Sequence, residues 1–232
     1  MATQIVVSPP STPVIEPWTI HDSNITLHEC LSRRNPPIPN EIILQILDDS
    51  SRWIRTKIIN AGLANDNELT RVGSHVRNHG QQQILATNQL SSLEVARIRR
   101  VVFTFRSQDQ GWSGDPLHHG TFNGSWTWFE ASLTRFIGTD YSEQERDDLT
   151  KIKEEKEKVR YQLQRNRHAG REPENYRHEL GIDHALLQQV EEGDSFVLWA
   201  RARYPAWENR VYKAVIEVWC VDDLEGVLKS TA

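Results

Sequence analysis

Cysteine is scarce in this sequence of 232 residues, and the two that occur, Cys30 and Cys220, lie far apart. Structural zinc sites need closely spaced cysteine or histidine pairs, and small disulfide-stabilised folds need several cysteines. The sequence therefore excludes a zinc ribbon and a disulfide scaffold, and we expect no metal and no other cofactor.

Long apolar runs are also missing. The N-terminal segment has one short apolar run, Ile5 to Val7, which is too brief for the core of a signal peptide and follows no basic residue. No stretch is long and apolar enough to cross a bilayer. We therefore expect a cytoplasmic or nuclear protein with no membrane partner.

An excess of basic residues is lacking as well. The chain has 27 Lys and Arg against 32 Asp and Glu, which gives a net charge of −5. Proteins that bind nucleic acid usually carry a basic stripe and a positive charge. We therefore expect no nucleic-acid partner.

Proline is unevenly distributed, because seven of the ten prolines fall in the first 39 residues. Such a segment buries too little apolar surface to offset the entropy that is lost on ordering. We predict that residues 1–36 form a disordered, proline-rich tail. A second, short tail is expected at residues 223–232.

Residues 37–90 are predicted to be a helical segment followed by a linker. Apolar side chains recur at helical spacing between Ile42 and Ile54, and Pro39 and Asn40 stand where a helix would begin. Further along, this range is rich in Asn, Gln and His and has no clear periodicity.

The stretch from Ile38 to Asp49 resembles the opening helix of an F-box. The resemblance covers about 12 residues, and the part from 63 onward does not supply the later F-box helices. It implies that Ile42, Ile46 and Leu47 form a docking face for a ubiquitin-ligase scaffold. An ordinary amphipathic helix that packs these side chains on the main domain is the alternative.

Beyond residue 91 the apolar period changes from helical to alternating, and this pattern continues to about 222. Alternation with turn residues between the segments is typical of antiparallel strands. We therefore predict a mainly β fold, an antiparallel, jelly-roll-like β-sandwich preceded by the N-terminal helical segment. The segments predicted as strands are 93–107, 125–133, 159–166, 194–204 and 210–219.

Two local predictions accompany this fold. The segments 194–204 and 210–219 are joined by "PAWEN", whose proline and asparagine suit a turn, and we predict that they pair as a hairpin. Residues 140–158 are densely charged with few apolar positions, which favours a solvated helix inserted into the sandwich domain.

Three blocks within residues 93–219 resemble a family of uncharacterised filamentous-fungal proteins, many of which carry an F-box-like helix near the N-terminus. The blocks read "VVFTFRSQDQGWSGDPLHHGTFNGSWTWFE", "LQRNRHAG" and "GDSFVLWARARYPAWENRVYKAVIEVW". The resemblance implies a β-sandwich of the kind that serves as a ligand-binding or partner-binding module. It implies no defined activity.

The residue patterns give no support for catalysis or metal binding. His118 and His119 are adjacent and would face opposite sides of a strand, and neither has partners at a metal-motif spacing. The serines lack a G-x-S-x-G elbow. We therefore assign no catalytic residue and no metal ligand.

The loops at 106–119, 166–170 and 204–210 allow two interpretations, and the first is a binding site. Aromatic rings beside amides and charged groups offer a flat apolar platform with directed hydrogen bonds. In the alternative, the tryptophans fill the core and the polar residues hold the loops, with Arg106 and Asp109 as a buried ion pair. The candidate ligand-binding residues are Arg106, Asp109, Trp112, His168, Trp207 and Asn209.

The leading hypothesis is a non-enzymatic, intracellular binding module that recognises a protein or a small polar ligand through loops at one end of the sandwich. The first alternative is an F-box-like substrate adaptor of a ubiquitin ligase. The second is a small-molecule enzyme of a fungal biosynthetic pathway, which would need converging histidines and carboxylates in a pocket.

Overall fold

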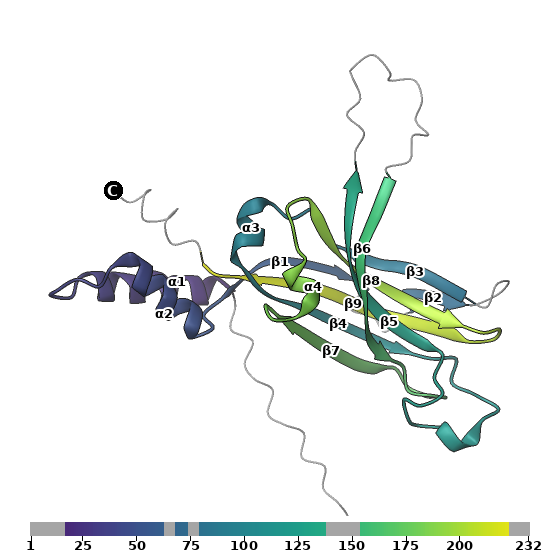
Figure 1. Cartoon of the computed structure of the whole chain (residues 1–232). Helices are drawn as coiled ribbons and strands as arrows, with labels where there is room; N and C mark the ends of the chain where they lie inside the picture. The colour runs from purple at the N-terminus through teal and green to yellow at the C-terminus, as the bar shows by residue number, and fades with distance from the viewer. Residues whose placement is uncertain (1–16, 63–67, 74–78, 138–153, 223–232) are drawn as a thin grey trace, which may run out of the picture. The chain divides into compact units, whose positions relative to one another are not determined.

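The computed structural model describes residues 17–62, 68–73, 79–137 and 154–222 (Figure 1). The chain divides into two compact units, one within residues 1–54 and 221–232 and the other over residues 55–220. Each unit has its own apolar core.

The first unit is built on two helices, α1 (Pro17–Ser32) and α2 (Asn40–Asp49). Ile43 and Leu47 of α2 are almost fully buried and pack against apolar side chains of α1, including Leu31. The unit also has a buried amide: Asn24 Nδ2 donates to the Arg52 carbonyl and to Asp222 Oδ2, both at 3.1 Å.

These helices correct two predictions. Residues 17–32 form a helix where we predicted disorder, because the prolines spare this stretch and Pro17 stands at its first residue, where no N–H is required. The rest of the predicted tail, residues 1–16, lies outside the described residues. The predicted helix at 38–54 is confirmed as α2, but it ends at Asp49, and a strand begins at Ile54.

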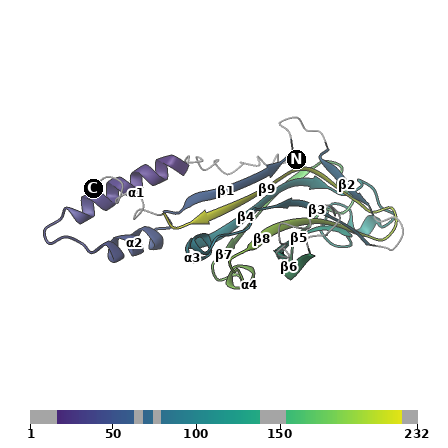
Figure 2. The same ribbon diagram turned by 90° about the horizontal axis from the view of Figure 1, so that it is seen from above.

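The second unit is the predicted β-sandwich. Its elements are β1 (Ile54–Ala61), β2 (Thr70–Gly73), β3 (His79–Ala86), α3 (Ser92–Arg97), β4 (Ile98–Gln108), η1 (Pro116–His118), β5 (Thr127–Ile137), β6 (Glu154–Arg165), β7 (Glu174–Gly181), α4 (Ala185–Gln188), β8 (Asp194–Arg203) and β9 (Glu208–Cys220). One sheet has the order β1-β9-β4-β7, with β2 also paired to β9, and the other has the order β3-β8-β5-β6. Figure 2 shows the two sheets as stacked layers.

The pairing is that of a jelly roll. The pairs β1–β9, β3–β8, β4–β7 and β5–β6 are nested in sequence and fall alternately into the first and the second sheet. One long hairpin rolled on itself produces this arrangement, with each sheet facing the core on one side. The predicted mainly β, jelly-roll-like sandwich is therefore confirmed.

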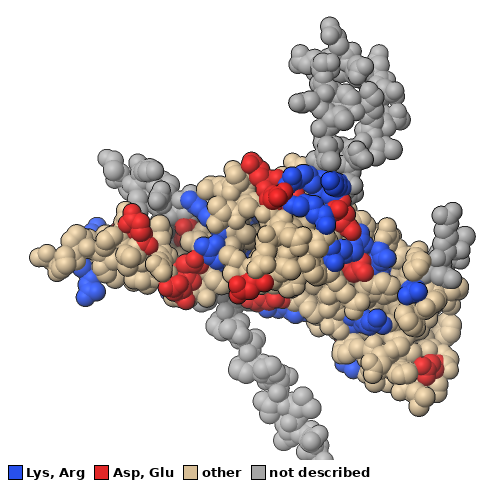
Figure 3. Space-filling view, viewed as in Figure 1, with Lys and Arg blue, Asp and Glu red and all other residues tan. Residues whose placement is uncertain are grey.

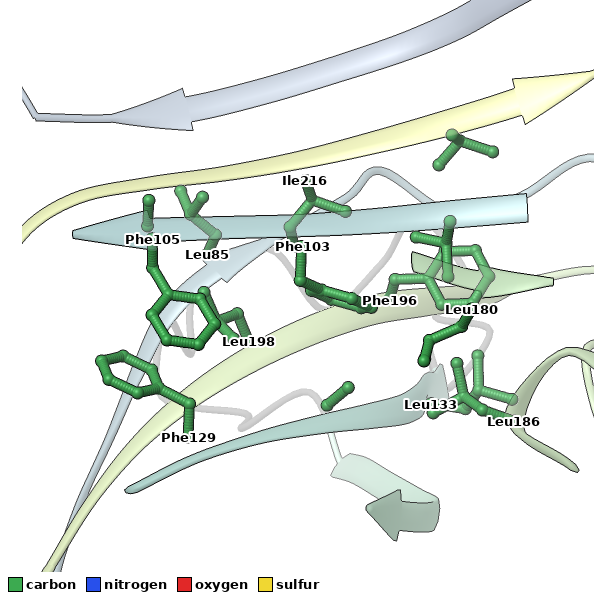
Figure 4. Close-up of a cluster of buried hydrophobic side chains, with 14 of the residues drawn as sticks. Leu85, Phe103, Phe105, Phe129, Leu133, Leu180, Leu186, Phe196, Leu198 and Ile216 are labelled. Atoms are coloured by element: carbon green, nitrogen blue, oxygen red, sulfur yellow. The ribbon is translucent and has the colours of Figure 1, made fainter. Parts of the chain in front are cut away.

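Phenylalanines and aliphatic residues, not tryptophans, fill the space between the sheets. Phe103, Phe105, Phe129 and Phe196 are fully buried, whereas every tryptophan whose side chain is described is at least partly exposed. Figure 4 shows Phe105 of β4 and Phe129 of β5 facing each other across the two layers, with ring centroids 4.0 Å apart. The alternative in which the tryptophans fill the core is wrong.

The predicted hairpin of 194–204 and 210–219 is also wrong. Both segments are strands, but β8 lies in the second sheet and β9 in the first, and each pairs with other strands. The connector turns from one sheet to the other, with positive φ at Tyr204 and Ala206. A register shift between Lys213 and Val211 also interrupts the alternation of β9, so that Val211 is buried and Tyr212 is partly exposed.

Two other boundaries change. The range 37–90 contains β1, β2 and β3, so the sandwich begins well before residue 91. The apolar alternation there is weak because β3 carries three consecutive glutamines. Within the predicted helical insertion, residues 154–158 belong to strand β6, and residues 140–153 lie outside the described residues, as does the predicted tail at 223–232.

None of the helices in the described ranges is long and apolar enough to cross a membrane.

Candidate functional site: the loop end of the sandwich

Three connections meet at one end of the sandwich, which we call the loop end: residues 109–126, 166–173 and 204–207. The register requires this, because Gln108 at the end of β4 pairs with Arg210 near the start of β9, and Trp128 near the start of β5 pairs with Arg165 at the end of β6. In Figure 1 this end lies at the right. The predicted gathering of the three loops is therefore what the fold produces.

Asp109 ties two of these loops together. Its side chain is fully buried; Oδ1 accepts the Gly111 N–H at 2.8 Å, and Oδ2 accepts the Ala169 N–H at 2.6 Å. Burial raises the pKa of the Asp109 carboxyl above its ordinary value, and the two backbone donors and the nearby His168 oppose this shift. The carboxylate therefore acts as a clamp between loops and is closed to a ligand.

The neighbouring Gln110 connects the same loop to the β8–β9 connection. Its Nε2 donates to the Trp112 carbonyl at 2.7 Å, and its Oε1 accepts the Glu208 N–H at 3.4 Å. The Gln110 side chain thus links the backbone at Trp112 to the start of β9.

A buried amide network lies directly beneath the loops. Asn166 Nδ2 donates to Asn209 Oδ1 at 2.9 Å and to Thr127 Oγ1 at 3.0 Å, and Ser107 Oγ donates to Asn166 Oδ1 at 2.7 Å. Asn209 Nδ2 donates to the Trp128 carbonyl at 3.0 Å. All four side chains are buried, so the network joins the strand ends of both sheets and offers no free group to a ligand.

His168 occupies the centre of the loop end and is only 1% exposed. Its Nδ1 lies 3.1 Å from the Asn123 carbonyl, and its ring centroid lies 5.6 Å from that of His119 and 5.2 Å from that of Trp207. Gly124 must be glycine here, because it has a φ of +67° and an added Cβ would lie 3.0 Å from His168 Nδ1.

The six predicted ligand-binding residues therefore divide into groups. Asp109, His168 and Asn209 are buried, and Trp207 packs edge-on against His168. Trp112 is 61% exposed and free to meet a ligand. Arg106 points away from the core on the outer face of the first sheet, 5.9 Å from the Tyr212 ring centroid, so we remove it from the site.

The buried Arg106–Asp109 ion pair of the alternative interpretation is not how the loop is held, because backbone N–H groups hold the Asp109 carboxylate. That alternative is correct in one respect: Asp109 serves the loop backbone, and Asn209 serves strand backbone beneath the loops.

Sequence reasoning missed two exposed apolar residues of the same loop. Leu117, in η1, is 87% exposed, and Phe122 is 40% exposed beneath the Arg167 guanidinium at 4.9 Å. With Trp112 they place three large apolar side chains on the surface within 11 positions. The sequence of the β4–β5 loop does not reveal that these side chains are exposed, because their exposure depends on how the buried residues fold the loop.

The histidines of this loop make local contacts. His118 Nδ1 lies 2.7 Å from Asp115 Oδ2, and this contact lowers the pKa of the Asp115 carboxyl. His119 Nε2 lies 3.1 Å from the Ser113 carbonyl. Within the described ranges, no three His, Cys, Asp or Glu side chains are grouped so as to hold a metal ion.

The predicted docking residues of α2 do not share one face. Ile42 and Ile46 are 48% and 39% exposed, whereas Leu47 is 1% exposed in the core of the first unit. A docking face on this helix would therefore consist of Ile42 and Ile46.

In comparisons with known proteins, no protein-family model matches the chain, and no curated protein matches its sequence.

Proposed function

We propose that the chain is a non-enzymatic binding module whose loop end recognises a partner protein. The observation that carries the proposal is the exposure of Trp112, Leu117 and Phe122 on a loop whose start is held by hydrogen bonds of the buried Asp109 and Gln110 side chains. Long connecting loops often carry function in compact domains, and several exposed large apolar side chains on one loop favour protein contact.

Preorganisation is the second part of the argument. Asp109, Gln110 and the Asn166–Asn209 pair fix the loop before any partner arrives, so little conformational entropy remains to be lost on binding. The same engagement speaks against a catalytic role for Asp109 and Asn209, since their polar atoms are already used. A small polar ligand fits less well than a protein, because the exposed groups are large and apolar.

An adaptor function remains a second candidate. Ile42 and Ile46 stand one helical turn apart on α2 and leave a small apolar ridge exposed while Ile43 and Leu47 hold the helix to its unit. In that case the ridge would bind a ubiquitin-ligase scaffold and the loop end would bind the substrate.

The test is a pair of matched double variants. Trp112→Ser with Leu117→Ser removes the apolar loop surface, and Leu93→Ser with Ile182→Ser removes two comparably apolar, exposed side chains near the opposite end of the sandwich. We expect the first pair to weaken capture of a partner from an extract of the native organism by at least about tenfold, which is about 1.4 kcal/mol. The second pair should leave capture unchanged, and both should keep the melting temperature. Equal capture by the loop variant and the unaltered chain would contradict the proposal.

A further inference from the structure

The outer face of the β3-β8-β5-β6 sheet carries alternating tryptophans and arginines. In β8 every second residue enters the core, so Trp199, Arg201 and Arg203 point outward. The Arg201 guanidinium lies 5.7 Å from the centroid of Trp128 on β5. The space-filling view of Figure 3 shows several separate blue patches on this face.

Away from the loop end, the cations on this sheet are matched by carboxylates. Asp194 is fully buried and accepts Arg135 Nε at 2.9 Å and Lys158 Nζ at 2.8 Å. In the middle of the face, Glu130 accepts Arg160 Nη1 at 3.1 Å and lies 3.6 Å from Arg201 Nε. These groups neutralise one another.

Nearer the loop end, the outer face of this sheet carries two more arginines. Arg165 and Arg203 each place their guanidinium carbon 5.7 Å from the Trp126 ring centroid, and Arg203 lies 4.9 Å from that of Tyr204. Arg165 Nη1 donates to the Ser125 carbonyl at 2.8 Å. Among the described residues neither arginine has an acidic partner, and the buried Arg203 Nε has no acceptor.

This group, Trp126, Arg165, Arg203 and Tyr204, is here named the arginine–tryptophan patch. Its two charges are partly withdrawn from water, and among the described residues their partners are ring faces and one carbonyl, so an incoming anion gains more there than on an open surface. In Figure 3 the blue patches toward the loop end are mostly surrounded by tan, with one red patch at the tip, whereas those farther away are interspersed with red. Two arginines without a carboxylate partner among the described residues therefore lie beside the proposed binding loop.

We propose that the arginine–tryptophan patch receives a carboxylate-rich segment of the partner protein that the loop end binds. The inference rests on the proposed function and adds the chemistry of the partner. Guanidinium groups form charge-assisted, fork-like hydrogen bonds with carboxylates, and the indole and phenol rings give the segment an apolar platform. Nucleic acid is the less suitable polyanion, because its binding needs many cations along a stripe and the chain as a whole carries a charge of −5.

The test uses a fluorescein-labelled oligo-glutamate peptide as the probe, with an oligo-glutamine peptide and a single-stranded oligonucleotide of equal charge beside it. We expect the full chain to bind the glutamate peptide more tightly than either, as measured by fluorescence anisotropy at low salt. The Arg165→Gln, Arg203→Gln double variant should lose at least about tenfold in affinity. The corresponding lysine variant keeps the charge and should recover part of that loss.

Arg177→Gln is the matched control, because Arg177 is exposed and pairs with Glu179 on β7, in the other sheet. We expect it to change peptide affinity by less than about twofold. An unchanged affinity in the double glutamine variant, an equal loss in Arg177→Gln, or tighter binding of the oligonucleotide would each overturn the inference.

The failure of this inference is distinguishable from failure of the proposed function. If Trp112→Ser with Leu117→Ser abolishes partner capture while the double glutamine variant captures the partner normally, the loop end is the binding site and the acidic-segment inference is wrong. If the loop variant captures the partner normally, the proposed function itself fails.

Discussion

Replacing Phe105 with alanine should lower the free energy of unfolding of the sandwich by about 3–5 kcal/mol, the range typical of large-to-small changes in a packed core. Phe105 is fully buried, and its ring stacks on Phe129 with centroids 4.0 Å apart and approaches Tyr176 at 5.6 Å. The Phe105–Phe129 contact joins the two sheets, so the cavity left by alanine opens between the layers. Urea unfolding followed by fluorescence measures the loss.

Phe122→Ala is the matched control for this change. Its ring is 40% exposed on the β4–β5 loop, so the same truncation there should change the unfolding free energy by less than about 1 kcal/mol. A double variant of Phe105 and Phe129 should lose less than the sum of the two single losses, because both changes remove one shared contact. Strict additivity, or equal losses for Phe105 and Phe122, would mean that the sheets are not packed as described.

Asp109→Asn should destabilise the loop end by about 2–4 kcal/mol, because the amide retains one acceptor oxygen and turns an NH₂ group toward a buried backbone donor. The carboxylate now accepts the N–H groups of Gly111 and Ala169, and the variant leaves one of them without a partner. Hydrogen exchange at these two amides should accelerate together with the fall in stability. The change is small in volume, so the effect isolates the hydrogen bonds.

Asp183→Asn provides the comparison, since Asp183 is exposed between β7 and α4. It should change the unfolding free energy by less than about 0.5 kcal/mol. If Asp109→Asn binds the partner poorly but melts at the unaltered temperature, Asp109 contacts the partner directly and the clamp assignment is wrong.

The sandwich was predictable from sequence because alternation is a local property of each strand. Val101, Phe103 and Phe105 stand at every second position of the sequence, and all three are buried in the structure. Alternation does not reveal which sheet a strand joins, and this is why 194–204 and 210–219 were wrongly predicted to pair. The two positive-φ residues that turn the chain between the sheets, Tyr204 and Ala206, are not types that usually mark such a turn.

The location of the candidate site was predictable from the sequence, but the roles of its residues were not. The polar residues around Asp109, His168 and Asn209 indicated a cluster of loops, and the fold brings these loops together. Burial then decides that these residues hold the loop, and burial is a tertiary property that no short motif records. The pattern "WARAR" does place Trp199, Arg201 and Arg203 on one strand face, and this signal for the arginine-rich surface was present in the sequence.

The most direct test of the loop end as the binding surface is hydrogen exchange, measured by mass spectrometry on the chain alone and with its captured partner. We expect slowed exchange within residues 109–126 and at the end of β8, with no change in β7 on the other sheet. Protection confined to α2 or to β7, with unchanged exchange in 109–126, would contradict the account.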